Sequence, residues 1–311
     1  MRVGLQLDPS GDPAEVADEA RRTEELGFDL LSAGEHVFFH GPVSNAFVTL
    51  AAAAVATERV RLVSALTVLP LYPMVLAAKQ AATVDRISHG RFELGLGLGG
   101  EYPKEFAASG VPVNGRGARV EESLPALLDL LAGKTVTASG AYGSLDCLRL
   151  DPPPMQPHVP VWMGGRRQAA MRRAGRFADI WLPYMMTPES YARGLAAVTE
   201  AADDAGRPSG AVSGGLYLWG SVDESAGRAR REAVETVGWL YQQDFEPLAD
   251  RYLLHGQPDA VAARIAEYAM AGARSLIFAP ACPPERRAAV VALFAQAVLP
   301  FCRDLDQETP R

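Results

Sequence analysis

The segment SAGEHVFFHG places two histidines directly after an apolar run that is typical of a β-strand. Glu35 and His36 end this run, and His40 follows four residues later. A neutral imidazole can donate or accept a proton near physiological pH, so His36 is a candidate general acid or base, or a hydrogen-bonding partner of a flavin-type ring. A solvated loop histidine is the alternative, and the residues alone favour it. Glu35 and His40 are candidates for lining the mouth of the same site.

The stretch FELGLGLGG has the G-x-G-x-x-G spacing of dinucleotide folds at Gly95, Gly97 and Gly100. That motif belongs to dinucleotide binding when it ends the first strand of a strand–helix–strand unit and opens a helix. Here it lies in the fourth apolar run, and no clean helix start follows. Strand alternation instead places the leucines on one face and Gly95, Gly97 and Gly99 on the other. We expect the glycine face to leave room for a broad, flat group to approach the backbone.

A third candidate site begins at the glycine pair Gly164 and Gly165, which ends an apolar run before RRQAAMRRAG. This following stretch has a helical pattern. The free N–H groups at a helix N-terminus, the positive end of its dipole, form a phosphate site, to which Arg166 and Arg167 can add charge. The alternative is an ordinary turn whose arginines face solvent.

The elements that must position these residues follow one pattern, because short apolar runs alternate with longer amphipathic stretches along the chain. Asp12, Pro13 and Glu15 predict the start of the first helix, and Gly27 predicts its end. Eight strand–helix units without a Pro/Ser-rich linker predict an α/β fold, a closed (β/α)8 TIM-type barrel, as a single domain over residues 1–311. The strands are predicted to begin at Val3, Phe28, Arg61, Phe92, Val159, Asp179, Gly214 and Ser275.

Two stretches exceed the minimal unit. Residues 133–158, after strand 4, are alternating and rich in turn residues, which predicts a hairpin insertion. Residues 244–257, in the connection from strand 7 to strand 8, are irregular. Insertions on the strand C-terminal side shape an active-site mouth. The segment SHGR precedes strand 4 at the opposite end of the barrel, so Arg91 is assigned to structure.

Composition and charge exclude several classes of protein. The net charge of −7 and the absence of a basic block argue against a nucleic-acid partner. Cys147, Cys282 and Cys302 lie far apart, so neither a disulfide framework nor a metal site is predicted. The N-terminus has no signal-peptide pattern, and the longest uncharged run, residues 62–78, is too short to span a bilayer. We therefore expect a cytoplasmic protein without a membrane partner.

Several stretches together resemble the luciferase-like monooxygenase superfamily. AATVDRISHGRFELGLGLGGEYPKEF, followed by NGRGARVEES, is similar to its LD-x-LS-x-GR-x-x-LG-x-G-x-G segment and later RG-x-x-x-x-E. HVPVWMGGRRQAAMRRAGRFADIWLP is similar to its P-x-x-GG segment with the helix and D-G-W strand that follow. The resemblance covers nearly the whole chain. It implies a TIM-type barrel with insertions, a homodimer, and binding of FMN or the deazaflavin coenzyme F-420 at the strand C-terminal ends. Within the superfamily, the F-420-dependent oxidoreductases have the most similar sequence segments.

The resemblance also implies roles for particular residues. His36 falls on a position that contacts the reactive cofactor ring in many members, and Gly164 and Gly165 fall on the segment that holds the cofactor phosphate. Deazaflavin-dependent relatives often have a non-prolyl cis peptide behind the ring, which in LVSALTVLP would join Ala65 to Leu66.

One departure from the family concerns the end of the glycine run. The family's sugar-phosphate dehydrogenases have a proton-donating glutamate directly after the last glycine of G-x-G-x-G, where this chain has Gly100. Glu101 comes one residue late, so a sugar-phosphate dehydrogenase is not expected and the substrate is unspecified.

The sequence therefore predicts an oxidoreductase that transfers hydride between coenzyme F-420 and a small organic substrate. An FMNH2- and O2-dependent monooxygenase on the same barrel is the alternative, and a non-catalytic flavin-binding relative is a third possibility. No metal ligands are predicted. The predicted site residues are His36 as the catalytic residue, Ser64, Ala65, Leu66, Gly97, Gly99, Gly164, Gly165, Arg166 and Arg167 for the cofactor, and Glu35, His40 and Glu101 at the substrate mouth.

Overall fold

The structure is a computed structural model that describes residues 1–9 and 13–305. The chain forms two compact units, and each is described separately below. The first unit comprises Met1–Leu7, Arg22–Ser32 and the chain from Gly164 onward, and the second comprises Asp8–Arg21 and Ala33–Met163.

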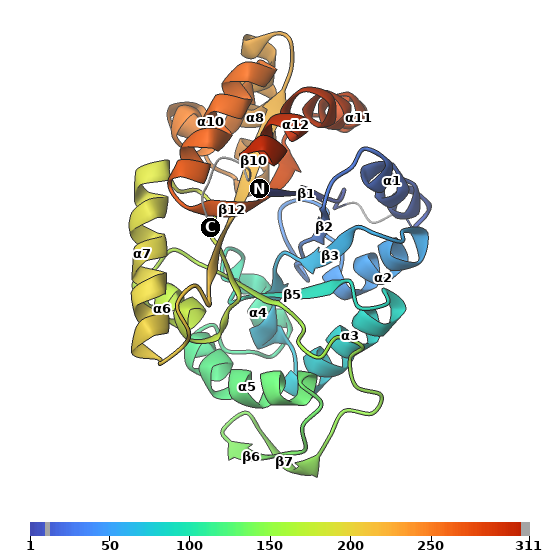
Figure 1. Ribbon diagram of the computed structural model, residues 1–311, viewed down its shortest axis with the longest axis vertical. Helices are drawn as coiled ribbons and strands as arrows, with labels where there is room; N and C mark the ends of the chain where they lie inside the picture. Colours follow the sequence, from blue (N-terminus) through green and yellow to red (C-terminus); the bar gives the residue numbers. More distant parts are fainter. Residues whose placement is uncertain (10–12, 306–311) are drawn as a thin grey trace. The chain divides into compact units, whose positions relative to one another are not determined.

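The first unit is built on parallel strands in the order β11-β10-β12-β1-β2, with β9 also paired to β10. Figure 1 labels β10, β12, β1 and β2 of these strands. In register, Gly4 of β1 lies between Leu30 of β2 and Ile277 of β12. Helices α6 and α7 pack against each other beside this sheet. The strands are β1 Arg2–Gln6, β2 Leu30–Ala33, β9 Ile180–Leu182, β10 Ser213–Val222, β11 Leu254–Gly256 and β12 Ala273–Pro280. The helices are α6 Gln168–Phe177, α7 Pro188–Asp204, α8 Ala226–Tyr241, α9 Ala249–Tyr252, α10 Pro258–Met270, α11 Pro284–Leu293 and α12 Leu299–Asp304, with short turns Glu246–Leu248 and Phe294–Val298.

The second unit is built on the parallel strands β3, β5 and β8, with the short β4 also paired to β5. An antiparallel hairpin, β6 and β7, lies beyond α5, where Glu122 accepts the N–H of Tyr142 at 3.1 Å (Figure 1). The strands are β3 Arg61–Ser64, β4 Thr67–Val68, β5 Phe92–Gly97, β6 Val136–Gly140, β7 Gly143–Leu148 and β8 Val161–Gly164. The helices are α2 Ala46–Ala56, α3 Met74–Ile87, α4 Pro103–Ala108 and α5 Arg116–Leu131, with a short turn Leu69–Leu71. Helix α1, Pro13–Glu25, contributes to both units.

The fold is the predicted TIM-type (β/α)8 barrel, because parallel strands alternate with helices along the chain in both units. Each of the eight predicted strands begins within two residues of its predicted start. The strands are near-continuous apolar runs, as expected where both faces of a parallel sheet are covered. Residues 244–257 differ from the irregular segment expected there, since they contain a helical turn, α9 and β11. These elements have three or four residues each, too few to show periodicity.

The helix boundaries follow local signals where the structure describes them. Gly27 ends the first helix with a φ of +86°, in the left-handed region that favours glycine. Asp12, the predicted N-cap of this helix, lies outside the described residues. Thr187 and Ser190 form a capping box at the start of α7.

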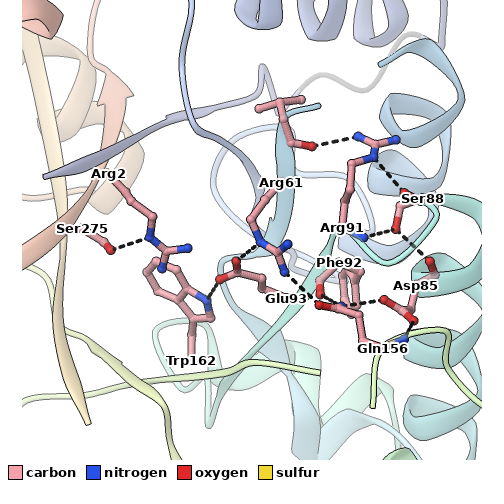
Figure 2. A network of polar contacts seen from close by, with 11 residues as sticks. Arg2, Arg61, Asp85, Ser88, Arg91, Phe92, Glu93, Gln156, Trp162 and Ser275 are labelled. Carbon is pink, nitrogen blue, oxygen red and sulfur yellow. Dashed lines mark hydrogen bonds and ion pairs between the residues drawn. The ribbon is translucent and has the colours of Figure 1, made fainter. Parts of the chain in front are cut away.

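Arg91 is confirmed as a structural residue. It is buried, and its guanidinium donates to the carbonyl oxygens of Ala54, Thr57 and Val60 at 2.8–2.9 Å, which satisfies groups that the end of α2 leaves unpaired. Its Nε also donates to the carbonyl of Ser88 at 2.8 Å (Figure 2).

A buried carboxylate ties the three main strands of the second unit together (Figure 2). Glu93 on β5 pairs with Arg61 at the start of β3 and accepts from Trp162 Nε1 on β8 at 2.6 Å. Arg61 also donates to Gln156 at 3.0 Å. Because Arg61 is the first residue of its strand, this network lies at the N-terminal end of the unit's strands, the end that serves stability in barrels of this kind. The C-terminal ends carry the candidate site.

Candidate functional site

His36 lies three residues beyond β2 and is paired with Glu105 of α4. Its Nδ1 is 3.1 Å from each carboxylate oxygen of Glu105, and Glu105 also accepts the N–H of Val37 at 3.2 Å. Glu105 is fully buried. Because a carboxylate accepts hydrogen bonds, Nδ1 of the neutral imidazole carries the proton and Nε2 is left as an acceptor. Within residues 1–9 and 13–305, Nε2 makes no hydrogen bond.

Aromatic side chains fix the His36 ring from a second direction. Phe39 stacks on it with ring centroids 4.2 Å apart and an interplanar angle of 14°. Tyr102, the residue before α4, packs edge-on against both Phe39 and His40. The ring of His40 contacts Phe39 and Tyr102, so His40 lies in the same aromatic cluster as His36. This packing holds the loop after β2 against the start of α4. The place of His40 at the substrate mouth stays a prediction.

Glu35, predicted at the mouth, is instead buried, with 6% of its surface exposed. Both carboxylate oxygens accept hydrogen bonds from the chain itself, the shortest from the N–H of Val68 at 2.8 Å. Burial raises the pKa of Glu35, and the hydrogen bonds from Val68, Tyr72 and Ala46 oppose that shift. Burial likewise raises the pKa of Tyr72, whose hydroxyl donates to Glu35 at 2.9 Å.

The predicted cis peptide between Ala65 and Leu66 is present. Directly before it, the hydroxyl of Ser64 donates to the carbonyl of Gly95 at 3.0 Å and accepts the N–H of Gly95 at 2.9 Å. This reciprocal pair fixes the end of β3 against β5.

The glycine face of β5 is not open as expected. A Cβ at Gly95 would overlap the carbonyl oxygen of Ser64, and one at Gly97 would lie 3.2 Å from Cβ of Leu66. The chain itself therefore uses the space left by the missing side chains, because Ser64 and Leu66 pack directly on the strand. Contact of Gly97 or Gly99 with a cofactor stays a prediction.

The turn after β5 brings an arginine to the strand's C-terminal end. Gly100 has a φ of +121°, and a Cβ there would lie 2.5 Å from Nη2 of Arg116. Arg116 donates to the carbonyl of Val113 at 2.8 Å and lies over the Phe106 ring. Its buried Nε has no hydrogen-bonding partner in the described part of the chain. Arg116 opens the RG-x-x-x-x-E motif, which was the only sequence signal for it. Glu101 is exposed in the turn before α4.

In the first unit, Gly164 and Gly165 lead from β8 into α6. Gly165 has a φ of +108°, and a Cβ there would lie 2.5 Å from Cβ of Ala170 in α6. Its carbonyl accepts from Trp181 Nε1 at 2.9 Å. Only glycine therefore permits this tight entry into the helix, whose first N–H groups have no partner inside the helix.

The two arginines at this helix start differ in their surroundings. Arg166 is anchored, because its Nη1 donates to the carbonyl of Met185 at 2.9 Å and its guanidinium lies 5.3 Å from the ring centre of Tyr184. Arg167 is the exposed N-cap residue of α6 and makes no side-chain capping bond. Two positive charges at the positive end of a helix dipole suit an anion such as a phosphate.

The second unit thus brings His36 to Glu105 and places His40 in the adjoining aromatic cluster, while Ser64 and Leu66 pack on β5 and Arg116 lies beside the turn after it. Sequence reasoning missed Glu105 and Arg116. Glu105 was missed because EYPKEF showed no clean helix start, whereas residues 103–108 form α4. Among the described residues, no group of three or more His, Cys, Asp or Glu could hold a metal ion. No helix in that part of the chain is long and apolar enough to cross a membrane.

The chain matches the luciferase-like monooxygenase family over residues 1–275. It therefore belongs to the luciferase-like monooxygenase family, whose oxidoreductase members share this barrel.

Two proteins with similar sequences match different shares of the chain. An uncharacterized protein of Mycobacterium tuberculosis (strain ATCC 25618 / H37Rv) is 32% identical over 177 residues, which are 57% of this chain and 60% of that protein. The match thus spans less than two thirds of that relative. The F420-dependent glucose-6-phosphate dehydrogenase of Nakamurella multipartita is 29% identical, with 94% of each chain covered.

Solved structures with the same fold include proteins of both cofactor classes. An F420-dependent secondary alcohol dehydrogenase, in complex with an F420-acetone adduct, has a TM-score of 0.84 at 21% identity, covering 97% of this chain and 99% of that one. The FMN-bound oxygenating constituent of 3,6-diketocamphane monooxygenase from Pseudomonas putida has a TM-score of 0.77 at 20% identity, covering 97% and 98%. At these identities the likeness establishes the fold.

Proposed function

We propose that this protein is an oxidoreductase that binds coenzyme F-420 and transfers a hydride between it and a small organic substrate. The observation that carries the proposal is the pairing of His36 with the buried Glu105, which leaves Nε2 without a hydrogen-bonding partner among the residues that the structure describes. Such an imidazole can take or give a proton at a substrate oxygen, and the carboxylate stabilises the ring when it is protonated. A non-catalytic flavin-binding relative would not need this pairing.

Each unit, taken by itself, offers groups that suit one part of a phosphate-bearing flavin or deazaflavin. In the first unit, the N–H groups at the start of α6 have no partner inside the helix, and Arg166 and Arg167 beside them add positive charge, which suits a phosphate. In the second unit, Leu66 offers an apolar surface and His36 a hydrogen-bonding group for a ring. The bound coenzyme supplies hydride donor and acceptor chemistry, while His36 handles the proton. The F420-dependent relatives support this choice of coenzyme.

An FMNH2- and O2-dependent monooxygenase is the second candidate. Its support is the family itself and the FMN-bound monooxygenase of the same fold. FMN also carries a phosphate and a flavin ring, so the groups that each unit offers suit FMN as well.

Anaerobic titration of the purified protein with F-420 and with FMN, followed by ring absorbance and fluorescence, tests the proposal. Micromolar binding of F-420 alone supports the first candidate, and binding of FMN alone supports the second. Binding of neither removes both.

We also propose that the protein is a homodimer that uses α2. This helix has no charged side chain, and Val48 and Val55, seven residues apart, are 69% and 77% exposed. A helix that is apolar all round is usually covered, and a second copy would cover it. Light scattering should give the mass of a dimer for the wild type and of a monomer for Val48→Asp. A wild-type monomer would overturn this assignment.

A further inference from the structure

Glu35 joins three separate segments of the second unit at one buried carboxylate. Oε1 accepts the N–H of Val68 at 2.8 Å. Oε2 accepts from the hydroxyl of Tyr72 at 2.9 Å, from Nδ2 of Asn45 at 3.2 Å and from the N–H of Ala46 at 3.4 Å. Both oxygens are thus occupied by donors of the chain, which leaves Glu35 little capacity to bind a substrate.

The partners of Glu35 are also bonded to one another. Asn45 donates from Nδ2 to the hydroxyl of Tyr72 at 2.7 Å, and its Oδ1 accepts the N–H of Val48, which caps α2. The carboxylate therefore fixes the start of α2 and the residue after the Leu69–Leu71 turn at the same time.

Through Val68 the carboxylate also fixes residues 66–68, the segment whose Leu66 we propose as the apolar surface for a cofactor ring. This segment is called the Leu66–Val68 wall below. Val68 belongs to β4 and is paired with Gly97 of β5. Leu66, two residues earlier, packs on Gly97, and Val68 lies beside Gly99. His36 directly follows Glu35 in the chain, so one anchor holds both the backbone of His36 and the Leu66–Val68 segment.

We propose that Glu35 is a positioning residue, which holds the Leu66–Val68 wall in a fixed relation to the His36 imidazole instead of touching substrate at the mouth. The proposal rests on the proposed function insofar as Leu66 and His36 face a cofactor ring. The hydrogen-bond geometry itself is a property of the chain without cofactor, and it can be tested on that form.

The variant Glu35→Gln tests this inference, because an amide keeps the size of the side chain but turns one acceptor into a donor. All four present partners donate, so at least one would face another donor and be left unpaired. In the cofactor-free protein, hydrogen exchange of peptides covering residues 64–72 should become faster. The affinity for F-420 or FMN should fall about ten-fold, and the visible circular dichroism of the bound ring should change.

Asp85→Asn is a matched control. Asp85 is also buried in the second unit and accepts the N–H groups of Met155 and Gln156 at 2.6 and 3.0 Å and Nε2 of Gln156 at 2.7 Å. Asp85 anchors the segment before β8. Asp85→Asn should therefore speed hydrogen exchange around residues 153–158 and leave the cofactor affinity within two-fold of the wild-type value. Urea unfolding of both variants shows whether they lose similar stability.

The outcomes distinguish a failure of the proposed role of Glu35 from a failure of the proposed function. Faster exchange at residues 64–72 with weaker binding in Glu35→Gln alone supports the inference. Unchanged affinity and ring spectrum in Glu35→Gln, or an equal loss of affinity in Asp85→Asn, overturns it. If the wild type binds neither cofactor, the proposed function fails, and the exchange experiment alone decides whether Glu35 holds the segment. If Glu35→Gln does not fold, Tyr72→Phe, which removes a single donor, takes its place with the same expected directions.

Discussion

Nδ1 of His36 and the carboxylate of Glu105 are 3.1 Å apart, although the two residues are separated by 69 positions in the chain. The pairing fixes the ring's tautomer and orientation, and Phe39 covers one ring face. A histidine in a strand-end loop therefore has a fixed ring orientation. The first two predictions below concern this pair.

We expect His36→Ala to lower turnover by about 10²–10⁴-fold, the usual range for a positioned acid or base, with a much smaller change in cofactor affinity. Steady-state kinetics and cofactor titration measure the two effects. If His36 only holds the cofactor, affinity would fall while saturated turnover survives. If it is a solvated loop histidine, neither quantity would change. His158→Ala, at an exposed position before β8, is the control. Until a substrate is known, stopped-flow reoxidation of bound FMNH2 by O2 can replace the turnover assay in part, and it is informative only if FMN is the cofactor.

We expect Glu105→Gln to lower turnover by a smaller factor, about 10–100-fold, as for other partners that orient a functional histidine. Glutamine keeps a hydrogen bond to the imidazole but removes the charge that stabilises its protonated form, and it permits the other tautomer. Steady-state kinetics measure the loss of turnover. Wild-type kinetics in this variant would show that Glu105 has only a packing role.

The variant Arg167→Glu, at the start of α6, should weaken binding of FMN or F-420 about ten-fold. Its negative side chain would repel a phosphate bound at the helix N-terminus. The affinity for riboflavin, or for a deazaflavin without phosphate, should not change. Arg172→Glu, an exposed position one turn further along the helix, is the matched control. An equal loss with the phosphate-free ligands would contradict the assignment. We prefer this test to Gly165→Glu, because a side chain at Gly165 would meet Ala170 and strain the backbone whether or not a phosphate binds.

Gly95→Ala should destabilise the fold by at least about 1–3 kcal/mol, because the added methyl group would overlap the backbone of Ser64 and no side-chain movement can relieve that contact. Urea unfolding followed by circular dichroism measures the loss. Gly227→Ala is the control, since a Cβ there would meet nothing within 4 Å in α8. Equal stability of the two variants would refute the packing argument.

The stability of the protein should depend on pH through Glu35. Its pKa is raised in the folded state by burial, above an ordinary value of 4.5. The folded state therefore binds this proton more tightly than the unfolded state, so the contribution is complete below the ordinary pKa and is lost as pH rises through the raised one. The free energy of unfolding of the wild type minus that of Glu35→Gln should decrease as pH rises above 4.5. A difference that stays flat between pH 4.5 and 8 would show that Glu35 does not titrate in this way.

The sequence by itself determined those features of the fold that depend on local periodicity and on the order of elements along the chain. Apolar runs of strand length alternating with amphipathic stretches are enough to define eight strand–helix units, because strand and helix periods are properties of neighbouring residues. The position of His36 after β2 follows from the same pattern. The two-residue strand β4 was missed because so short a segment has no readable period.

Only the tertiary structure decided what surrounds those residues. Glu105 becomes the partner of His36 because α4 folds back to the end of β2, and nothing in EYPKEF marks that contact. Glu35, adjacent to His36 in the chain, turned out to be buried among donors from α2, β4 and Tyr72. The face of Gly95 and Gly97 is filled by Ser64 and Leu66. Hydrogen bonding and close packing between distant segments depend on distances of a few ångströms, which residue type and spacing do not encode locally.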